Sequence, residues 1–193
     1  HQDRAEFSTA LALFEANQER GVELGIPWSP YCFESRFMRG QVLISTGRWD
    51  EALSVIEVAG ESPPPVYEAM LAGLEAQVRV GRGDAAAIRG IEEGRRYWHK
   101  EGMVALVATT AMLELAEQRA DGDAARKAYD ELVTTLSETW HDRFQARMRF
   151  SALALGVLGT AAGSLSAADR EAVLEEAREL HDDGRRTFDH HRE

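Results

Sequence analysis

Residues 47–52 read GRWDEA, and residues 81–86 read GRGDAA. Each stretch lies between two segments with apolar residues at helical spacing, and the stretches begin 81 − 47 = 34 residues apart. This offset is the period of the tetratricopeptide repeat, in which each unit is a helix, a turn and a second helix. The two stretches therefore predict the turns of two successive helical pairs.

The segments before the two turns follow the same period. Phe33 corresponds to Tyr67 at the offset of 34, and the apolar positions in each segment are spaced by 4, 3 and 4 residues. This spacing places them on one face of a helix. Gly47 and Gly81 are expected just past the end of that helix, in the left-handed conformation that glycine adopts without steric strain. The other pairs at this offset are Phe37 and Leu71, Gly40 and Leu74, Ile44 and Val78, Asp50 and Asp84, and Ala52 and Ala86.

Helical patterns continue along the rest of the chain, and no segment shows the alternating β-branched and aromatic residues of a strand. The predicted fold class is all-α, a tetratricopeptide-like α-α superhelix of about nine antiparallel helices in one domain, residues 1–193. Because the sequence begins at His1 rather than at a methionine, we expect a fragment of a larger protein. The expected helices span about 3–21, 33–46, 49–60, 65–80, 84–98, 103–119, 123–139, 143–163 and 167–189.

The composition argues against two classes of partner. The chain contains 33 acidic and 22 basic residues, for a formal net charge of −11. DNA, RNA and anionic membranes all attract basic surfaces, and no apolar run approaches the ~18–20 residues of a membrane span. We therefore expect no direct nucleic-acid contact by this segment and no membrane association. Cys32 is the only cysteine, which excludes an internal disulfide and suits a cytoplasmic protein.

Several short motifs partly match known catalytic or metal-binding patterns. Residues 81–86 match the loose dinucleotide fingerprint GxGxxA, but that loop follows a strand, and a helix is expected here. Glu138 and His141 form a single ExxH pair, whereas a di-iron site uses two. The His and Asp residues at 181–183 and 189–191 are expected to form a solvated face rather than a metal site. No catalytic residue, cofactor or metal is predicted, and an α-helical enzyme stays open as a third reading.

Three features together resemble one protein family: the turn GRWDEA, the 34-residue period and the segment FQARMRFSALALGVLGTAA at 144–162. They look like the helical-repeat region of large LuxR-family transcriptional regulators, the MalT-like group. In that family a nucleotide-hydrolysing STAND module precedes a tetratricopeptide-like array, and a helix-turn-helix follows it. The resemblance runs from about Leu24 to the end. It implies a sensor or interaction domain, with ATP hydrolysis and DNA binding in other parts of a larger regulator.

A binding groove is the sharper functional hypothesis. In a stack of helical pairs, the first helix of each pair lines the concave side. Glutamates dominate the polar residues expected there, which favours a partner with basic or amine groups. The alternative is that these are ordinary solvated residues. By the repeat register, the candidate groove residues are Glu34, Gln41 and Ser45 in the first unit and Glu68, Glu75 and Arg79 in the second.

The sequence thus predicts a non-catalytic sensor or protein-interaction domain of a LuxR-type transcriptional regulator. Such a domain would bind a protein or small-molecule effector through the groove and would need no cofactor. The competing interpretation is a freestanding tetratricopeptide-like scaffold protein with no transcriptional role. Self-association as a homodimer is a further expectation, because the open ends of solenoids often pair.

Overall fold

A computed structural model of the protein describes residues 6–163 and 165–192 and shows an all-α fold. Within these residues there are nine α-helices, two short 3-10 helices and no strand. The 3-10 helices, η2 (Ala85–Ala87) and η3 (Arg95–Tyr97), flank the fifth α-helix. The α-helices are α1 (Phe7–Glu23), α2 (Pro30–Ser45), α3 (Trp49–Ile56), α4 (Pro65–Gly81), α5 (Ile88–Gly94), α6 (Gly102–Gln118), α7 (Gly122–Thr139), α8 (Ala146–Ala162) and α9 (Ala167–Arg192).

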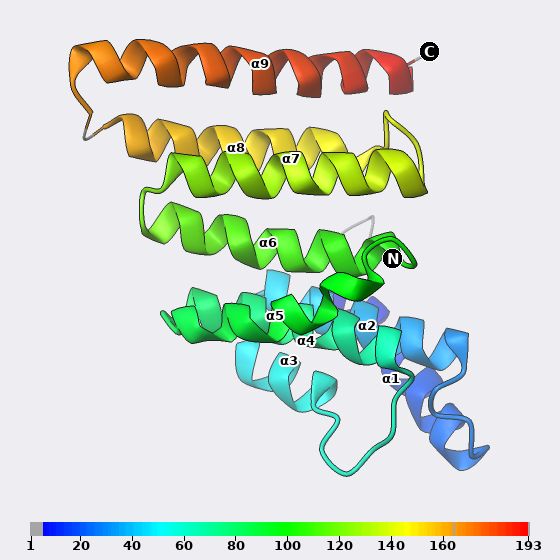
Figure 1. The fold of residues 1–193 in the computed structure, drawn as a ribbon. Helices are drawn as coiled ribbons and strands as arrows, with labels where there is room; N and C mark the ends of the chain where they lie inside the picture. Colours follow the sequence, from blue (N-terminus) through cyan, green and yellow to red (C-terminus); the bar gives the residue numbers. More distant parts are fainter. Residues whose placement is uncertain (1–5, 164, 193) are drawn as a thin grey trace.

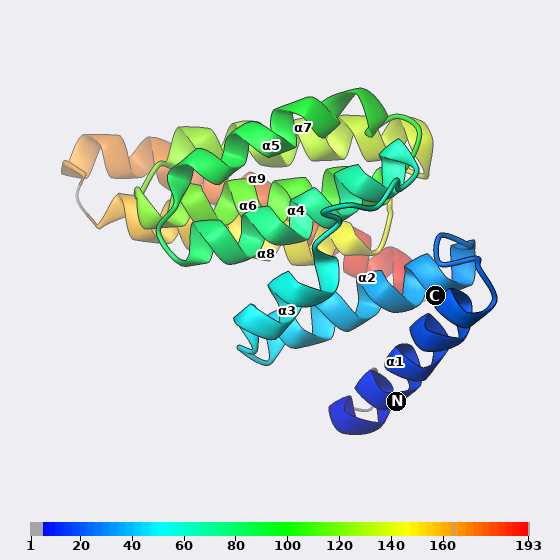
Figure 2. The same ribbon diagram turned by 90° about the horizontal axis from the view of Figure 1, so that it is seen from below.

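The helices stack as successive pairs: α2 with α3, α4 with α5, α6 with α7 and α8 with α9. Figure 1 shows α4 to α9 as successive layers, and Figure 2 shows α1 leaving these layers at an angle. The first helices of neighbouring pairs also contact one another. One hydrophobic core, from Phe33 on α2 to Leu180 on α9, runs through all of the pairs. The predicted helical-repeat fold is confirmed, because each pair buries its apolar face against its neighbours.

α6 lies at the centre of the array and contacts α4, α5, α7 and α8. Its apolar side chains nearly encircle it, and buried residues therefore occur on several of its faces. The contact with α4 is especially close at Gly73. A Cβ atom at this position would lie 2.3 Å from Cγ2 of Val107. The absence of a side chain at Gly73 therefore sets how closely α4 and α6 approach.

The turns after α2 and α4 close their helices at different positions. Gly47 follows α2 with a φ of +75°, as expected from the sequence. After α4 the left-handed glycine is Gly83, with a φ of +87°. Gly81 is still helical, and a Cβ on it would lie 3.0 Å from the ring of Trp49. The expectation for Gly81 is therefore wrong, and the equivalent turn glycines are 83 − 47 = 36 residues apart.

α3 is shorter than the predicted helix over 49–60. It ends at Ile56, and Arg36 of α2 forms a hydrogen bond and an ion pair with the chain near this end. Nε of Arg36 donates to the carbonyl oxygen of Val55 at 2.7 Å, and its guanidinium pairs with Glu61 at 2.9 Å. The carbonyl oxygen of Val55 therefore has a hydrogen-bond partner without the further helical turn that would otherwise supply one.

The predicted helix over 84–98 is divided into three pieces, η2, α5 and η3. Gly90 and Gly94 both lie in this segment, and glycine weakens a helix interior because it is more flexible when unfolded. Gly94 also brings the segment within reach of the array: a Cβ on it would lie 3.5 Å from Cβ of Ala69 and 3.7 Å from Cγ1 of Val104. The glycines thus weaken the helix, and Gly94 also allows the segment to pack closely against α4 and α6.

Candidate functional site

The first helices of the four pairs form a groove, which we call the inner groove. Its lining comes from the last turns of α2 and α4, from α6 along its length and from the first turns of α8, with Trp49 at the start of α3. Its volume is about 430 Å³, within the ~300–1,000 Å³ that is usual for small-ligand sites. The polar residues of the lining are Gln41, Ser45, Gln77, Thr110, Glu114 and Arg149.

The remaining side chains of the inner groove are mostly apolar. They give the groove an aliphatic and aromatic surface on which a non-polar group can rest, because burial of such a group removes it from water. Trp49 is fixed in place by a hydrogen bond from its Nε1 to the carbonyl oxygen of Ile44 at 3.2 Å. The larger apolar residues of the lining are Ile44, Trp49, Met103, Leu106, Val107 and Phe150.

The polar residues of the groove are arranged mainly to accept hydrogen bonds. Nε2 of Gln77 donates to the carbonyl oxygen of Val107 at 3.0 Å, so its Oε1 is left as an acceptor. The hydroxyl of Thr110 donates to the carbonyl oxygen of Leu106 at 2.9 Å, so its oxygen can also accept. Glu114 adds a third acceptor through Oε2, since its Oε1 already accepts from Nε2 of Gln118 at 3.3 Å. The groove can therefore bind ligand N–H and O–H groups.

Of the first-unit residues predicted to line a groove, two lie in it. Gln41 and Ser45 line the inner groove, near the end of α2. Glu34 is exposed on the same helix but two turns before Gln41, and it does not belong to the lining. The inner groove crosses only the last turns of α2, so a residue near the start of this helix lies outside it.

The second-unit residues are placed differently. Glu68 and Glu75 line a separate depression of about 640 Å³ between α3 and α4. Arg79 is bound to Glu75 at 3.2 Å and to Asp84 at 2.5 Å, and it does not line the inner groove. The predicted single glutamate-rich face is therefore not formed: two of its residues line the inner groove, two line this second depression, and Glu34 and Arg79 line neither.

The reason for this difference is the register of α4. The residues of α4 that line the inner groove are Gln77 and Gly81, which are 77 − 41 = 36 and 81 − 45 = 36 residues after their counterparts in α2. The sequence offset of 34 is two residues shorter. Two residues turn a helix by about 200°, so an error of two places a side chain on nearly the opposite face.

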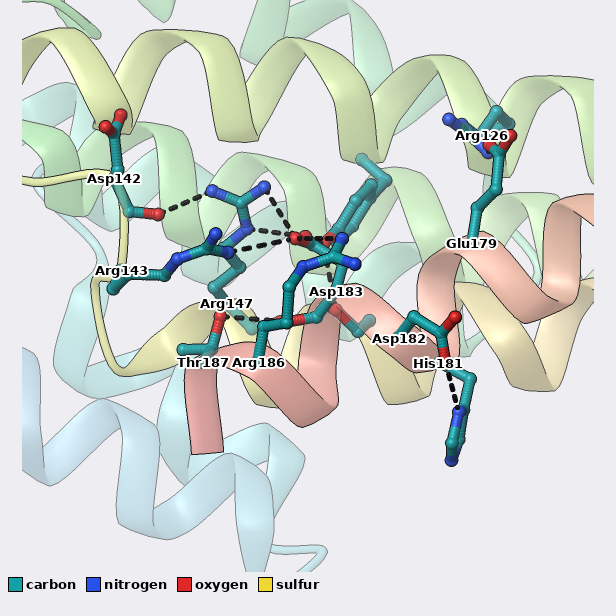
Figure 3. A network of polar contacts seen from close by, with 12 residues as sticks. Arg126, Asp142, Arg143, Arg147, Glu179, His181, Asp182, Asp183, Arg186 and Thr187 are labelled. Atoms are coloured by element: carbon teal, nitrogen blue, oxygen red, sulfur yellow. Dashed lines mark hydrogen bonds and ion pairs between the residues drawn. The ribbon is translucent and has the colours of Figure 1, made fainter. Parts of the chain in front are cut away.

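A second polar feature lies at the C-terminal end of the array, around Asp183 of α9. Its residue surface is only 7% exposed. Nε of Arg147 donates to Oδ2 at 2.5 Å, and Arg143 donates to Oδ1 at 3.2 Å. The Tyr129 hydroxyl also donates to Oδ2, and Arg186 lies 3.4 Å from Oδ1. Figure 3 shows the three arginines converging on this carboxylate. We define the Asp183 cluster as Tyr129, Arg143, Arg147, Ser151, Asp183 and Arg186.

The Asp183 cluster joins three helices. Tyr129 comes from α7, Arg147 and Ser151 from α8, and Asp183 from α9. The hydroxyls of Tyr129 and Ser151 lie 2.8 Å apart and share a hydrogen bond. Next to Asp183, Gly184 brings α9 close to α8, since a Cβ on it would lie 3.1 Å from Cβ of Ser151. The cluster therefore fixes the position of the last helix on the array.

The charges of the cluster are stable near neutral pH. Burial by itself raises the pKa of Asp183, but hydrogen bonds from Arg147 and Tyr129 outweigh it and hold this pKa below its ordinary value. Burial, together with the hydrogen bond to Asp183, raises the pKa of Tyr129 to about 12. Asp183 is thus ionised and Tyr129 neutral, an arrangement that suits a structural clamp rather than proton transfer.

The burial of Asp183 corrects the expectation that 181–183 form a solvated face. His181 and Asp182 are exposed and lie 3.1 Å apart, as such a face requires. Asp183 instead lies three residues after Leu180 and four before Thr187, both of which are buried. This helical spacing was the available signal, because it places Asp183 on the stripe that faces α8.

In residues 6–163 and 165–192, no group of His, Cys, Asp and Glu side chains is arranged to hold a metal ion. No helix in this part of the chain combines the length and apolarity that a membrane span requires. The sequence matches no protein-family model, and no curated protein and no solved structure is significantly similar to the chain.

Proposed function

We propose that this chain is a non-catalytic sensor or protein-interaction domain that binds its effector in the inner groove. The observation that carries the proposal is the lining of this groove, which four separate helical pairs contribute. A groove of this volume with an apolar surface and a few directed polar groups has the properties of a ligand site. Nothing in its arrangement requires a nucleophile or a cofactor.

A ligand in the inner groove contacts residues from α2 and α8, which belong to the first and last helical pairs. Repeat arrays bend at the interfaces between units, so a ligand that bridges several units favours one curvature over others. Such a shift in population needs only that the ligand binds one curvature more tightly. The effect on attached modules is then a coupling between the groove and the ends of the array.

The role in transcription depends on a different observation, the resemblance to the repeat region of LuxR-family regulators. We propose that the domain biases the ATP-hydrolysing and DNA-binding modules of such a regulator. The alternative function is a freestanding scaffold that uses the same groove to hold a partner. A phosphate-binding loop encoded before this segment and a helix-turn-helix encoded after it favour the regulator, and other flanking sequence favours the scaffold.

A thermal-shift screen against metabolites and short peptides tests the proposed site. A ligand that binds only the folded protein raises its melting temperature. Ser45→Trp places a large ring in the inner groove and is expected to abolish the shift. Ser62→Trp is the matched control, because Ser62 is exposed in the loop between α3 and α4 and lies outside the groove.

The outcome that contradicts the proposal is a set of ligands whose shifts are the same in wild type, Ser45→Trp and Ser62→Trp. A separate experiment tests the proposed role in transcription. In the intact protein, deletion of residues 1–193 is expected to remove the effector dependence of DNA binding. DNA binding with unchanged effector dependence after this deletion would refute a regulatory role.

A further inference from the structure

We infer that the inner groove takes a small ligand with a carboxylate, which Arg149 of α8 binds. The ligand would also carry an N–H or O–H donor and an apolar body, as free amino acids and short peptides do. This inference rests on the proposed function, because it assumes that the inner groove is the binding site. It goes further in naming the chemical class of the ligand and the residue that recognises it.

Arg149 is the first observation. Among the residues that the structure describes, it is the one cationic side chain that lines the inner groove, and it is exposed at the start of α8. Its guanidinium lies 6.0 Å from the ring centroid of Phe150, and no carboxylate of the described residues forms an ion pair with it. The chain has 33 acidic residues and 22 basic ones, so carboxylates are plentiful elsewhere. In the groove the guanidinium is left with all of its donors available.

Three other arginines are paired with carboxylates of the chain. Arg82 near the same end of α4 pairs with Asp50 at 2.7 Å, and Arg39 on α2 pairs with Glu15 at 2.5 Å. Arg147, which precedes Arg149 by two residues, is bound to Asp183. Because a planar guanidinium matches a carboxylate with two parallel hydrogen bonds, an unpaired arginine in a groove is suited to bind one from a ligand.

The rest of the lining narrows the ligand further. Oε1 of Gln77, the hydroxyl of Thr110 and the carboxylate of Glu114 are acceptors, so they suit an ammonium, amide or hydroxyl group. Ile44, Trp49 and Leu106 supply the surface for an apolar side chain. A volume of about 430 Å³ suits a small molecule rather than a folded partner. The groove thus combines an arginine that can bind a carboxylate, groups that accept hydrogen bonds and an apolar surface. This combination matches an amino-acid or short-peptide ligand.

The test uses a panel of amino acids, dipeptides and tripeptides with aliphatic or aromatic side chains, each as the free acid and as the C-terminal amide. Neutral oligosaccharides form a third arm. Affinities are measured by calorimetry on the whole chain. At least one free acid is expected to bind, and its amide is expected to bind about 10- to 100-fold more weakly, the range for the loss of hydrogen bonds to a charged group.

Two variants locate the effect. Arg149→Gln is expected to reduce the affinity for the free acid by a similar factor and to leave the weak binding of the amide unchanged. Arg119→Gln removes the same charge at the end of α6, where Arg119 is exposed and outside the groove lining, and it is expected to bind like wild type. Thermal denaturation of both variants shows that each is folded.

Three results overturn the inference. In the first, no free acid of the panel binds. In the second, free acid and amide bind equally. In the third, Arg149→Gln binds the free acid as well as Arg119→Gln does. A neutral oligosaccharide whose binding is prevented by Ser45→Trp but not by Arg149→Gln would show that the groove is a ligand site. The proposed carboxylate class of ligand would then be wrong. If no ligand is sensitive to Ser45→Trp, the proposed function itself fails.

Discussion

The ring of Phe33 on α2 stacks on the ring of Tyr67 on α4, with centroids 3.7 Å apart and planes 3° apart. These residues are 67 − 33 = 34 positions apart, which is the period between the two turns in the sequence. Residues at the 34-residue sequence offset therefore touch here, whereas the groove-lining residues near the ends of the same two helices follow an offset of 36. The contact joins the first pair of helices to the second.

The Phe33–Tyr67 pair predicts a measurable coupling. Phe33→Leu and Tyr67→Leu are expected to lose stability individually, and the double variant to lose less than their sum. The coupling should be about 0.5–1.5 kcal/mol, as for other aromatic pairs. Urea denaturation of the four proteins of the cycle measures it. Phe33→Leu combined with Phe188→Leu is the control, because Phe188 is partly exposed on α9 and the two effects should add.

The contact between α4 and α6 predicts opposite effects of the same substitution at two glycines. Gly73→Ala puts a methyl group against Val107, a stiff side chain, and is expected to cost about 1–3 kcal/mol of unfolding free energy. Gly90→Ala meets no atom within 4 Å and lies in α5, so it is expected to stabilise by up to about 1 kcal/mol. Chemical denaturation compares them. A neutral Gly73→Ala would show that α6 can shift away.

The Asp183 cluster predicts a large difference between two adjacent aspartates. Asp183→Asn leaves Arg143 and Arg147 without their carboxylate and is expected to lose about 3 kcal/mol, as when a buried ion pair is broken. Asp182→Asn removes a charge that is exposed beside His181, and its effect should stay within about 0.5 kcal/mol. Thermal and urea denaturation measure both. Equal effects of the two substitutions would mean that the cluster does not fix α9.

The pKa values of the same cluster predict a plateau of stability. The pKa of Asp183 is lower in the folded state, so its contribution is full above the unfolded value of about 3.9 and is lost as the pH falls through the folded pKa. The pKa of Tyr129 is raised to about 12, so its contribution is full below about 10 and is lost as the pH rises towards 12.

Substitutions at these two residues separate the two limits of the plateau. Asp183→Asn should flatten the acid limb relative to wild type, and Tyr129→Phe should flatten the alkaline limb. The measurement is the free energy of unfolding by urea between pH 3 and pH 11 in steps of about one unit. An acid limb that is identical in wild type and Asp183→Asn would disprove the assigned role of the carboxylate.

The sequence by itself determined the class of fold. The turn motifs at residues 47–52 and 81–86, with apolar residues at helical spacing between them, predict paired helices that must bury their apolar faces against neighbours. Two sequence signals were local and were therefore readable: the presence of the two turns and the apolar stripe of each helix. The exact offset was not, because the turn glycines of the structure are 36 rather than 34 residues apart.

Only the tertiary structure decided which polar residues meet. The residues of α4 that line the inner groove come 36 rather than 34 positions after their counterparts in α2, so Gln77 lines this groove and Glu75 lines the second depression. The burial of Asp183 depends on Tyr129, which is 54 residues away, and on Arg147, which is 36 residues away. A helical pattern shows that a residue faces inward, but not which charges face it, because those come from other helices whose register is set by packing.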